Sequence, residues 1–145
     1  MSNTKKTIAL SGFLLILISM TALTGCMLSA WSAKSAVATF LTYEKYNQWE
    51  QAWEMLHPDC QAIWDDKEEF TSKLNQPLTN LKSFEIGNAK IIPSWTFSST
   101  GKTYPDVAEI PITLIYSTTH GDMERSSMIH AVKLEDDWLF FQQKE

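Results

Sequence analysis

The 145-residue sequence has few of the residues that build metal, nucleotide or nucleic-acid sites. It contains two cysteines, three histidines and five glycines. The histidines, at 57, 120 and 130, have no ligand-like spacing to one another or to a cysteine, which disfavours a zinc site. The formal net charge is −5, and no lysine or arginine cluster follows Lys6, so no basic surface for phosphate backbones is expected. We therefore expect no metal, no cofactor and no nucleic-acid partner.

Motifs for covalent or phosphate chemistry are also absent from the sequence. It has no nucleophile-elbow serine, and the triplet Gly101-Lys102-Thr103 lacks the earlier glycine and the following helix of a phosphate-binding loop. Cys60 has His57 nearby but no catalytic cysteine context around it. We interpret Cys60 as a small buried residue at a helix start.

The N-terminal segment has a basic start, an apolar run and then a cysteine. Lys5 and Lys6 precede residues 8–23, which are mostly apolar and carry no charge. The run is followed by Thr24-Gly25-Cys26, and an uncharged stretch over residues 7–33 is long enough to cross a bilayer core of ~30 Å. The pattern indicates that the N-terminus enters a membrane.

Residues 23–26, Leu-Thr-Gly-Cys, resemble the lipobox of bacterial lipoproteins at all four positions. The resemblance implies a diacylglyceryl group on the Cys26 thiol, cleavage before Cys26, further acylation of the palmitate type, and a domain held outside the cytoplasm at the cell membrane. The alternative is an uncleaved transmembrane helix, because residues 27–31 remain apolar. The expected organisation is a signal peptide over 1–25, an anchor or short spacer over 26–34, and one domain over 35–145.

The first half of the expected domain has helical periodicity. Over residues 35–56, apolar side chains recur at helical spacing and end in Trp49, Ala52, Trp53 and Leu56, while Asn47 predicts a break or bend. Pro58 predicts the end of this segment. Asp59 is expected to cap a short turn, and Asp66 with Glu69 three residues later has the form of a capping box.

The second half is typical of β-strands. Residues 83–97 are rich in β-formers with a break at Gly87, residues 108–118 alternate apolar and polar, and residues 128–134 and 138–142 complete the pattern. Turn residues separate these runs at 98–103, 120–122 and 135–137. Helices followed by an antiparallel meander predict an α+β domain, with N-terminal helices packed on a strongly curved antiparallel sheet.

The order of residues 47–58, 66–70 and 132–138 resembles the nuclear transport factor 2-like superfamily. Within it, the sequence is similar to the non-catalytic N-terminal domain of methicillin-resistance penicillin-binding proteins. The resemblance implies a cone-shaped fold whose wide end holds a pocket, which is an active site in some members and is filled by side chains in others. It also implies homodimers through the outer sheet face, where Thr113, Ile115 and Ser117 are expected.

Candidate site residues follow from the expected faces of the elements. The candidates for lining the pocket are Trp53, Tyr116, His130 and Trp138, with Asp59 as a further carboxylate. Trp95 and Tyr104 flank the 98–103 loop and are candidates for an exposed binding surface.

Two functions remain open. One is a membrane-anchored, non-enzymatic binding or scaffolding module with an envelope-protein or cell-wall partner. The alternative is a pocket enzyme of the isomerase or dehydratase kind, which requires an open apolar cavity with a buried acid or His130 at its base.

Overall fold

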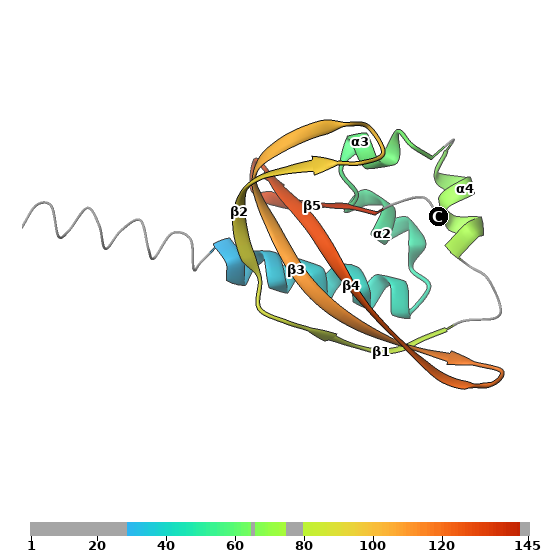
Figure 1. The fold of residues 1–145 in the computed structure, drawn as a ribbon. Helices are drawn as coiled ribbons and strands as arrows, with labels where there is room; N and C mark the ends of the chain where they lie inside the picture. Colours follow the sequence, from blue (N-terminus) through green and yellow to red (C-terminus); the bar gives the residue numbers. More distant parts are fainter. Residues whose placement is uncertain (1–28, 65, 75–79, 143–145) are drawn as a thin grey trace, which may run out of the picture.

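The computed structural model describes residues 29–64, 66–74 and 80–142 (Figure 1). It is an α+β fold in which helices precede one five-stranded antiparallel sheet, as the sequence predicts. The elements are a first helix over residues 29–45, α2 (Trp49–Glu54), α3 (Pro58–Gln61), α4 (Lys67–Leu74), β1 (Asn80–Ile86), β2 (Lys90–Phe97), β3 (Lys102–Thr118), β4 (Gly121–Leu134) and β5 (Asp137–Phe141). Cys26 and the segment 1–25 lie outside the described residues. Within the described part of the chain, no helix has the length and apolar character to span a bilayer.

The sheet is organised around β3, its longest strand. The first part of β3 pairs with β2, from Lys102 opposite Phe97 to Glu109 opposite Lys90, and its last part pairs with β1. On its other side β3 pairs with β4 from Ala108 to Thr118, and β4 pairs in turn with β5. The predicted alternation in β3 is confirmed, because its even-numbered residues Ile110, Ile112 and Leu114 are buried.

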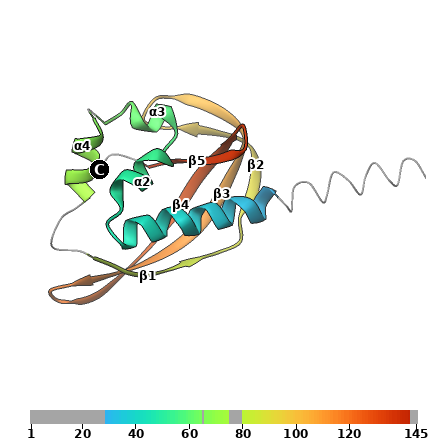
Figure 2. The same ribbon diagram turned by 180° about the vertical axis from the view of Figure 1, so that it is seen from behind.

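All the helices lie on one side of this sheet, which bends around the first helix (Figures 1 and 2). The first helix buries Ala33, Val37, Phe40 and Leu41, whose spacing places them on a single helical face. Trp64 and Phe70 extend this core beneath α2 and α4, with their rings perpendicular at a centroid distance of 5.2 Å. The chain is already helical at residue 29, so part of the 26–34 segment assigned to a spacer packs with the domain.

The helix ends show which capping predictions hold. In α4, the backbone N–H of Glu69 donates to the Asp66 carboxylate at 2.7 Å, as the capping pattern predicts. The prediction that Asp59 caps α3 is wrong, because His57 is the N-cap and its Nδ1 accepts from the Asp59 N–H at 3.1 Å. The Asp59 carboxylate instead faces β3, where it accepts a hydrogen bond from the Lys102 ammonium at 2.6 Å.

The strands also extend further than the sequence predicts. β3 begins at Lys102 and not near Ala108, because Asp106 adopts a positive φ of 50° within the strand and pairing with β2 continues past it. β4 begins at Gly121 and not at Met128, because Gly121 has a φ of 113° that permits a tight turn directly after Thr118. The result is a long β3–β4 ribbon that projects beyond the helices (Figure 1).

Candidate functional site

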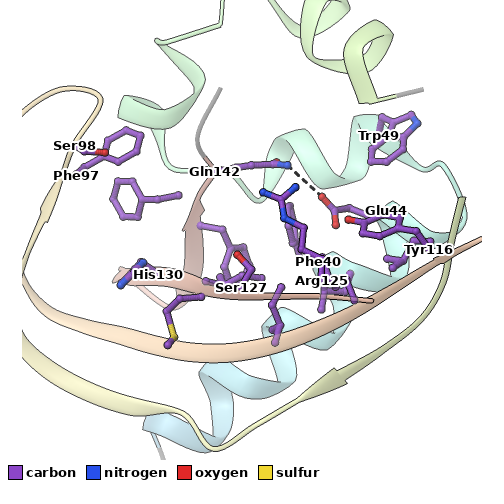
Figure 3. Close-up of a pocket in the computed structure, with 18 of the residues that line it drawn as sticks. Phe40, Glu44, Trp49, Phe97, Ser98, Tyr116, Arg125, Ser127, His130 and Gln142 are labelled. Carbon is purple, nitrogen blue, oxygen red and sulfur yellow. Dashed lines mark hydrogen bonds between the residues drawn. The ribbon is translucent and has the colours of Figure 1, made fainter. Parts of the chain in front are cut away.

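A pocket of about 840 Å³ opens between the first helix and the inner face of the sheet. Its walls come from the end of the first helix, from β3 and β4, and from the end of β5 (Figure 3). Most of the lining is apolar and includes Phe40, Leu81, Trp95, Phe97, Ile112, Leu114, Phe140 and Phe141. Polar side chains make up much of the remaining lining, and they determine what the pocket can recognise or react with: Glu44, Asn47, Thr96, Ser98, Arg125, Ser127, His130 and Gln142.

Glu44 is the acid of this pocket. It lies one turn after Phe40 on the first helix, and Figure 3 shows its carboxylate directed toward the side chain of Gln142. The Gln142 Nε2 donates to Glu44 Oε1 at 3.5 Å. Burial raises the pKa of Glu44 to about 7, and the bond from Gln142 opposes this rise only in part. The pocket leaves part of the residue accessible, so Glu44 can exchange a proton near neutral pH.

Two polar atoms of the lining are buried without a hydrogen-bond partner among the described residues. They are the indole Nε1 of Trp49, a donor, and the amide Oε1 of Gln142, an acceptor. A buried polar group without a partner costs about 1–3 kcal/mol, and a ligand that supplies the partner would recover this. The pocket therefore offers one donor and one acceptor to a ligand.

β4 supplies part of the wall of the pocket. Its alternate residues Met123, Arg125 and Ser127 line the pocket, and across the sheet they pair with Tyr116, Leu114 and Ile112 of β3. Arg125 adds a positive charge to this wall (Figure 3). The intervening residues of β4 belong to the other face of the sheet.

His130 lines the pocket at the end away from Glu44. Its ring stacks on Trp95 at a centroid distance of 4.2 Å, and its Nε2 lies 3.4 Å from the Glu109 carboxylate. Glu109 is also paired with Lys90, at 2.7 Å. Burial lowers the pKa of His130, and the Glu109 carboxylate opposes this. His130 is thus a neutral ring near pH 7, with its orientation fixed by Glu109 and Trp95.

A second set of polar side chains joins α3 to β3. The Asp59 carboxylate accepts from Lys102 and from the Tyr104 hydroxyl, and these bonds lower the pKa of Asp59. Burial and the neighbouring carboxylate raise the pKa of Tyr104 to about 12. The His57 ring packs edge-on against Tyr104 and stacks on Phe141. These groups satisfy one another, so we assign them a structural role.

The structure places the predicted site residues in three different environments. Tyr116 and His130 line the pocket, but Trp53 and Trp138 do not. Trp53 packs on Phe70 at 5.3 Å, and the buried Trp138 donates its indole N–H to the Ser32 hydroxyl at 2.9 Å. Trp53 and Trp138 therefore do not fill the pocket, and Tyr116 forms part of its lining.

Two further predictions concern exposure. Trp95 and Tyr104 are half-buried, because the Trp95 ring packs against both Tyr104 and Phe141. They do not form the exposed binding surface expected of them. Trp95 contributes to the pocket instead. Cys60 is buried, as predicted; its thiol contacts the backbone C=O and N–H of Gln142 at 3.0 and 3.1 Å, and burial raises its pKa to about 11.

The sequence reasoning missed Glu44, Arg125 and Gln142 as pocket residues. Glu44 carried a usable signal, because it lies seven residues after Val37 and four after Phe40, on the apolar face of the first helix. Arg125 alternates with Met123 and Ser127, but the strand was expected to start after it. Gln142 gave no signal, because its place depends on how β5 meets the helices.

No known family model and no curated protein matches the sequence. The described residues contain no group of three or more histidine, cysteine, aspartate or glutamate side chains that could hold a metal ion.

Proposed function

We propose that this protein is an extracytoplasmic binding module whose pocket holds an apolar ligand through a small number of hydrogen bonds. The open pocket of about 840 Å³ carries the proposal, since ligand sites typically occupy ~300–1,000 Å³. Its aromatic walls provide the apolar contact. The buried N–H of Trp49 and the amide oxygen of Gln142 provide unused hydrogen-bonding capacity that a ligand can satisfy.

We also propose that this module is held at the cell membrane. The lipobox around Cys26 supports a lipid anchor at the outer face of the cell membrane, which would bring the pocket to envelope partners. The helices inside a bent sheet support the cone-shaped, nuclear transport factor 2-like fold that the sequence resembles. Intact mass of the membrane form, with Cys26→Ser as control, tests the anchor, and an unmodified full-length mass would contradict it.

Binding of a neutral apolar dye, N-phenyl-1-naphthylamine, tests the pocket. Ser127 and Ser126 are neighbours on β4, but only Ser127 lines the pocket, so Ser127→Phe and Ser126→Phe form a matched pair. We expect Ser127→Phe to weaken dye binding by about tenfold and Ser126→Phe to leave it unchanged. Equal affinity of the three proteins for the dye would refute the pocket as the binding site.

One observation favours a second candidate function, which is acid–base catalysis by Glu44. A carboxyl group with a pKa of about 7 in an apolar pocket is suited to removing a proton from carbon and returning it. In a β,γ-unsaturated ketone, Glu44 would take the α-proton, the electron pair would move to the carbonyl oxygen, and Glu44 would return the proton at the γ-carbon. Arg125 and Tyr116 line the same pocket and could stabilise the enolate oxygen.

A measurement of substrate turnover distinguishes the binding function from the catalytic function. Catalysis predicts isomerisation of a β,γ-unsaturated cyclic ketone, measured by absorbance, with kcat/KM rising with pH around a midpoint of about 7. Glu44→Gln would abolish this turnover, and Glu44→Asp would retain part of it. A rate that is unaffected by Glu44→Gln would exclude this mechanism and leave the binding function.

A further inference from the structure

β4 has one edge that is only partly covered. It pairs with β3 from Gly121 opposite Thr118 to Ala131 opposite Ala108, but it pairs with β5 only from His130 to Leu134. Among the described residues, no strand pairs with the other edge of β4 over 121–129. Figure 1 shows the corresponding part of the β3–β4 ribbon extending past the end of β5.

This edge is suited to accept another strand. An uncovered edge presents a row of backbone N–H and C=O groups, and proteins commonly block such edges with charged side chains, above all lysine, with proline or with a bulge. Residues 121–129 contain no lysine and no proline, and residues 121–128 are all exposed. Their charged residues are Asp122, Glu124 and Arg125, and Asp122 is held by an ion pair with Lys82. The pairing of 121–131 with β3 proceeds one residue at a time, so no bulge interrupts the edge.

The same stretch of β4 forms the wall of the pocket. Met123, Arg125, Ser127 and Ile129 line it at every second position, and Met128 lines it as well. A chain added to the β4 edge would continue the sheet beyond the place where β5 ends. Its own alternate side chains would then project on the pocket side, because side-chain direction alternates with the same period in paired strands.

We propose that the ligand of the pocket is an extended peptide that pairs as an added strand with residues 121–129 of β4 and inserts an apolar side chain into the pocket. This inference rests on the proposed binding function and specifies its ligand class. The backbone edge recognises any extended peptide, and the pocket selects the apolar or aromatic side chain. The net charge of −5, with Asp122 and Glu124 exposed on the edge strand against the single positive charge of Arg125, favours a peptide of neutral or positive charge.

A blocked synthetic peptide, acetyl-Lys-Thr-Val-Thr-Phe-Thr-Lys-amide, provides a probe with apolar residues at alternate positions. Its binding would be measured by calorimetry against the full chain and against the Ser127→Phe and Ser117→Phe variants; Ser117 is exposed on β3, away from both the pocket lining and the free edge of β4. We expect Ser127→Phe to weaken binding by about tenfold and Ser117→Phe to have no effect. Replacing the peptide phenylalanine by threonine should cause a loss of similar size.

N-methylation of the probe tests the strand pairing itself. Methyl groups on alternate amide nitrogens block one edge of an extended peptide and leave the other edge free. We expect one methylated series to lose at least about tenfold in affinity and the other to bind as the parent does. Equal binding of the two series would overturn strand addition.

The remaining outcomes separate this inference from the function on which it rests. If the protein binds N-phenyl-1-naphthylamine but not the peptide, the peptide ligand is overturned and the pocket function stands. If it binds neither, the peptide ligand and the pocket function are both overturned. A stable dimer in sedimentation that excludes the peptide would assign the edge to a second copy of the chain and would also overturn the proposal.

Discussion

The raised pKa of Glu44 predicts a specific dependence of stability on pH. Between about 4.5 and about 7 the folded protein keeps the Glu44 proton, whereas the unfolded chain has lost it. The folded state then binds more protons than the unfolded state, so the free energy of unfolding falls as pH rises through this window. Glu44→Gln keeps the shape of the side chain and an acceptor for Gln142 but removes the buried charge. We therefore expect the variant to be more stable than the parent above pH 7.

The magnitude follows from the change in pKa. A rise from 4.5 to about 7 corresponds to about 3 kcal/mol, since each pKa unit is worth ~1.4 kcal/mol. This value is an upper bound, because the pocket admits water to part of Glu44 and water reduces the penalty. The gain should be absent below about pH 4.5, where Glu44 is protonated in both states.

Urea unfolding followed by tryptophan fluorescence, at a series of pH values, measures this difference. His57 and His130 also titrate, and their pKa values are lowered by burial, so their contribution to stability is lost as pH falls below 6.5. That trend has the opposite sign to the effect of Glu44. Because both histidines are present in parent and variant, subtraction cancels them. If the difference in the free energy of unfolding between Glu44→Gln and the parent does not change from pH 4 to pH 8, Glu44 is not a buried acid with a raised pKa.

Three further predictions test the packing around the pocket. Trp138→Phe should lower the free energy of unfolding by about 1 kcal/mol, and a double-mutant cycle with Ser32→Ala should assign most of it to their hydrogen bond. Cys60 should react slowly with a disulfide reagent at pH 8 in the folded protein and rapidly in urea; fast reaction when folded would contradict its burial. Gly87→Ala should destabilise by about 1–3 kcal/mol in thermal melts, because the new methyl would lie 2.7 Å from the Pro111 ring; an unchanged melting temperature would contradict this contact.

The sequence was sufficient for features that depend on local pattern. The N-cap bond from Glu69 to Asp66, the burial of Phe70 and the alternation along β3 all follow from spacing within a few residues, and all three hold. The class of the fold follows from them, because helices that precede an antiparallel meander have few ways to pack. The extents of β3 and β4 did not follow, since Pro105 and Gly121 resemble strand breakers until their pairing partners are known.

The pocket was predictable only in outline. Tyr116 and His130 were candidates from their strand positions, and both line it. The exposure assigned to Trp95 was wrong because this ring packs against Phe141, which comes from a later strand of the sheet. Glu44 became the acid of the site through the same long-range closure, which places Gln142 beside it. Contacts of this kind are set by tertiary packing, and local pattern carries little information about them.

The contacts between β5 and the helices also affect how the chain folds. The Phe140 backbone bonds to Met55 and His57, Cys60 contacts Gln142, and Trp138 bonds to Ser32, a separation of 106 residues. Contacts this distant in sequence require closure of large loops, which slows folding. The helical third of the domain therefore lacks its stabilising partner until β5 is available. In a protein delivered across a membrane, as proposed here, this delay would keep the chain unfolded and able to pass through until most of it has crossed.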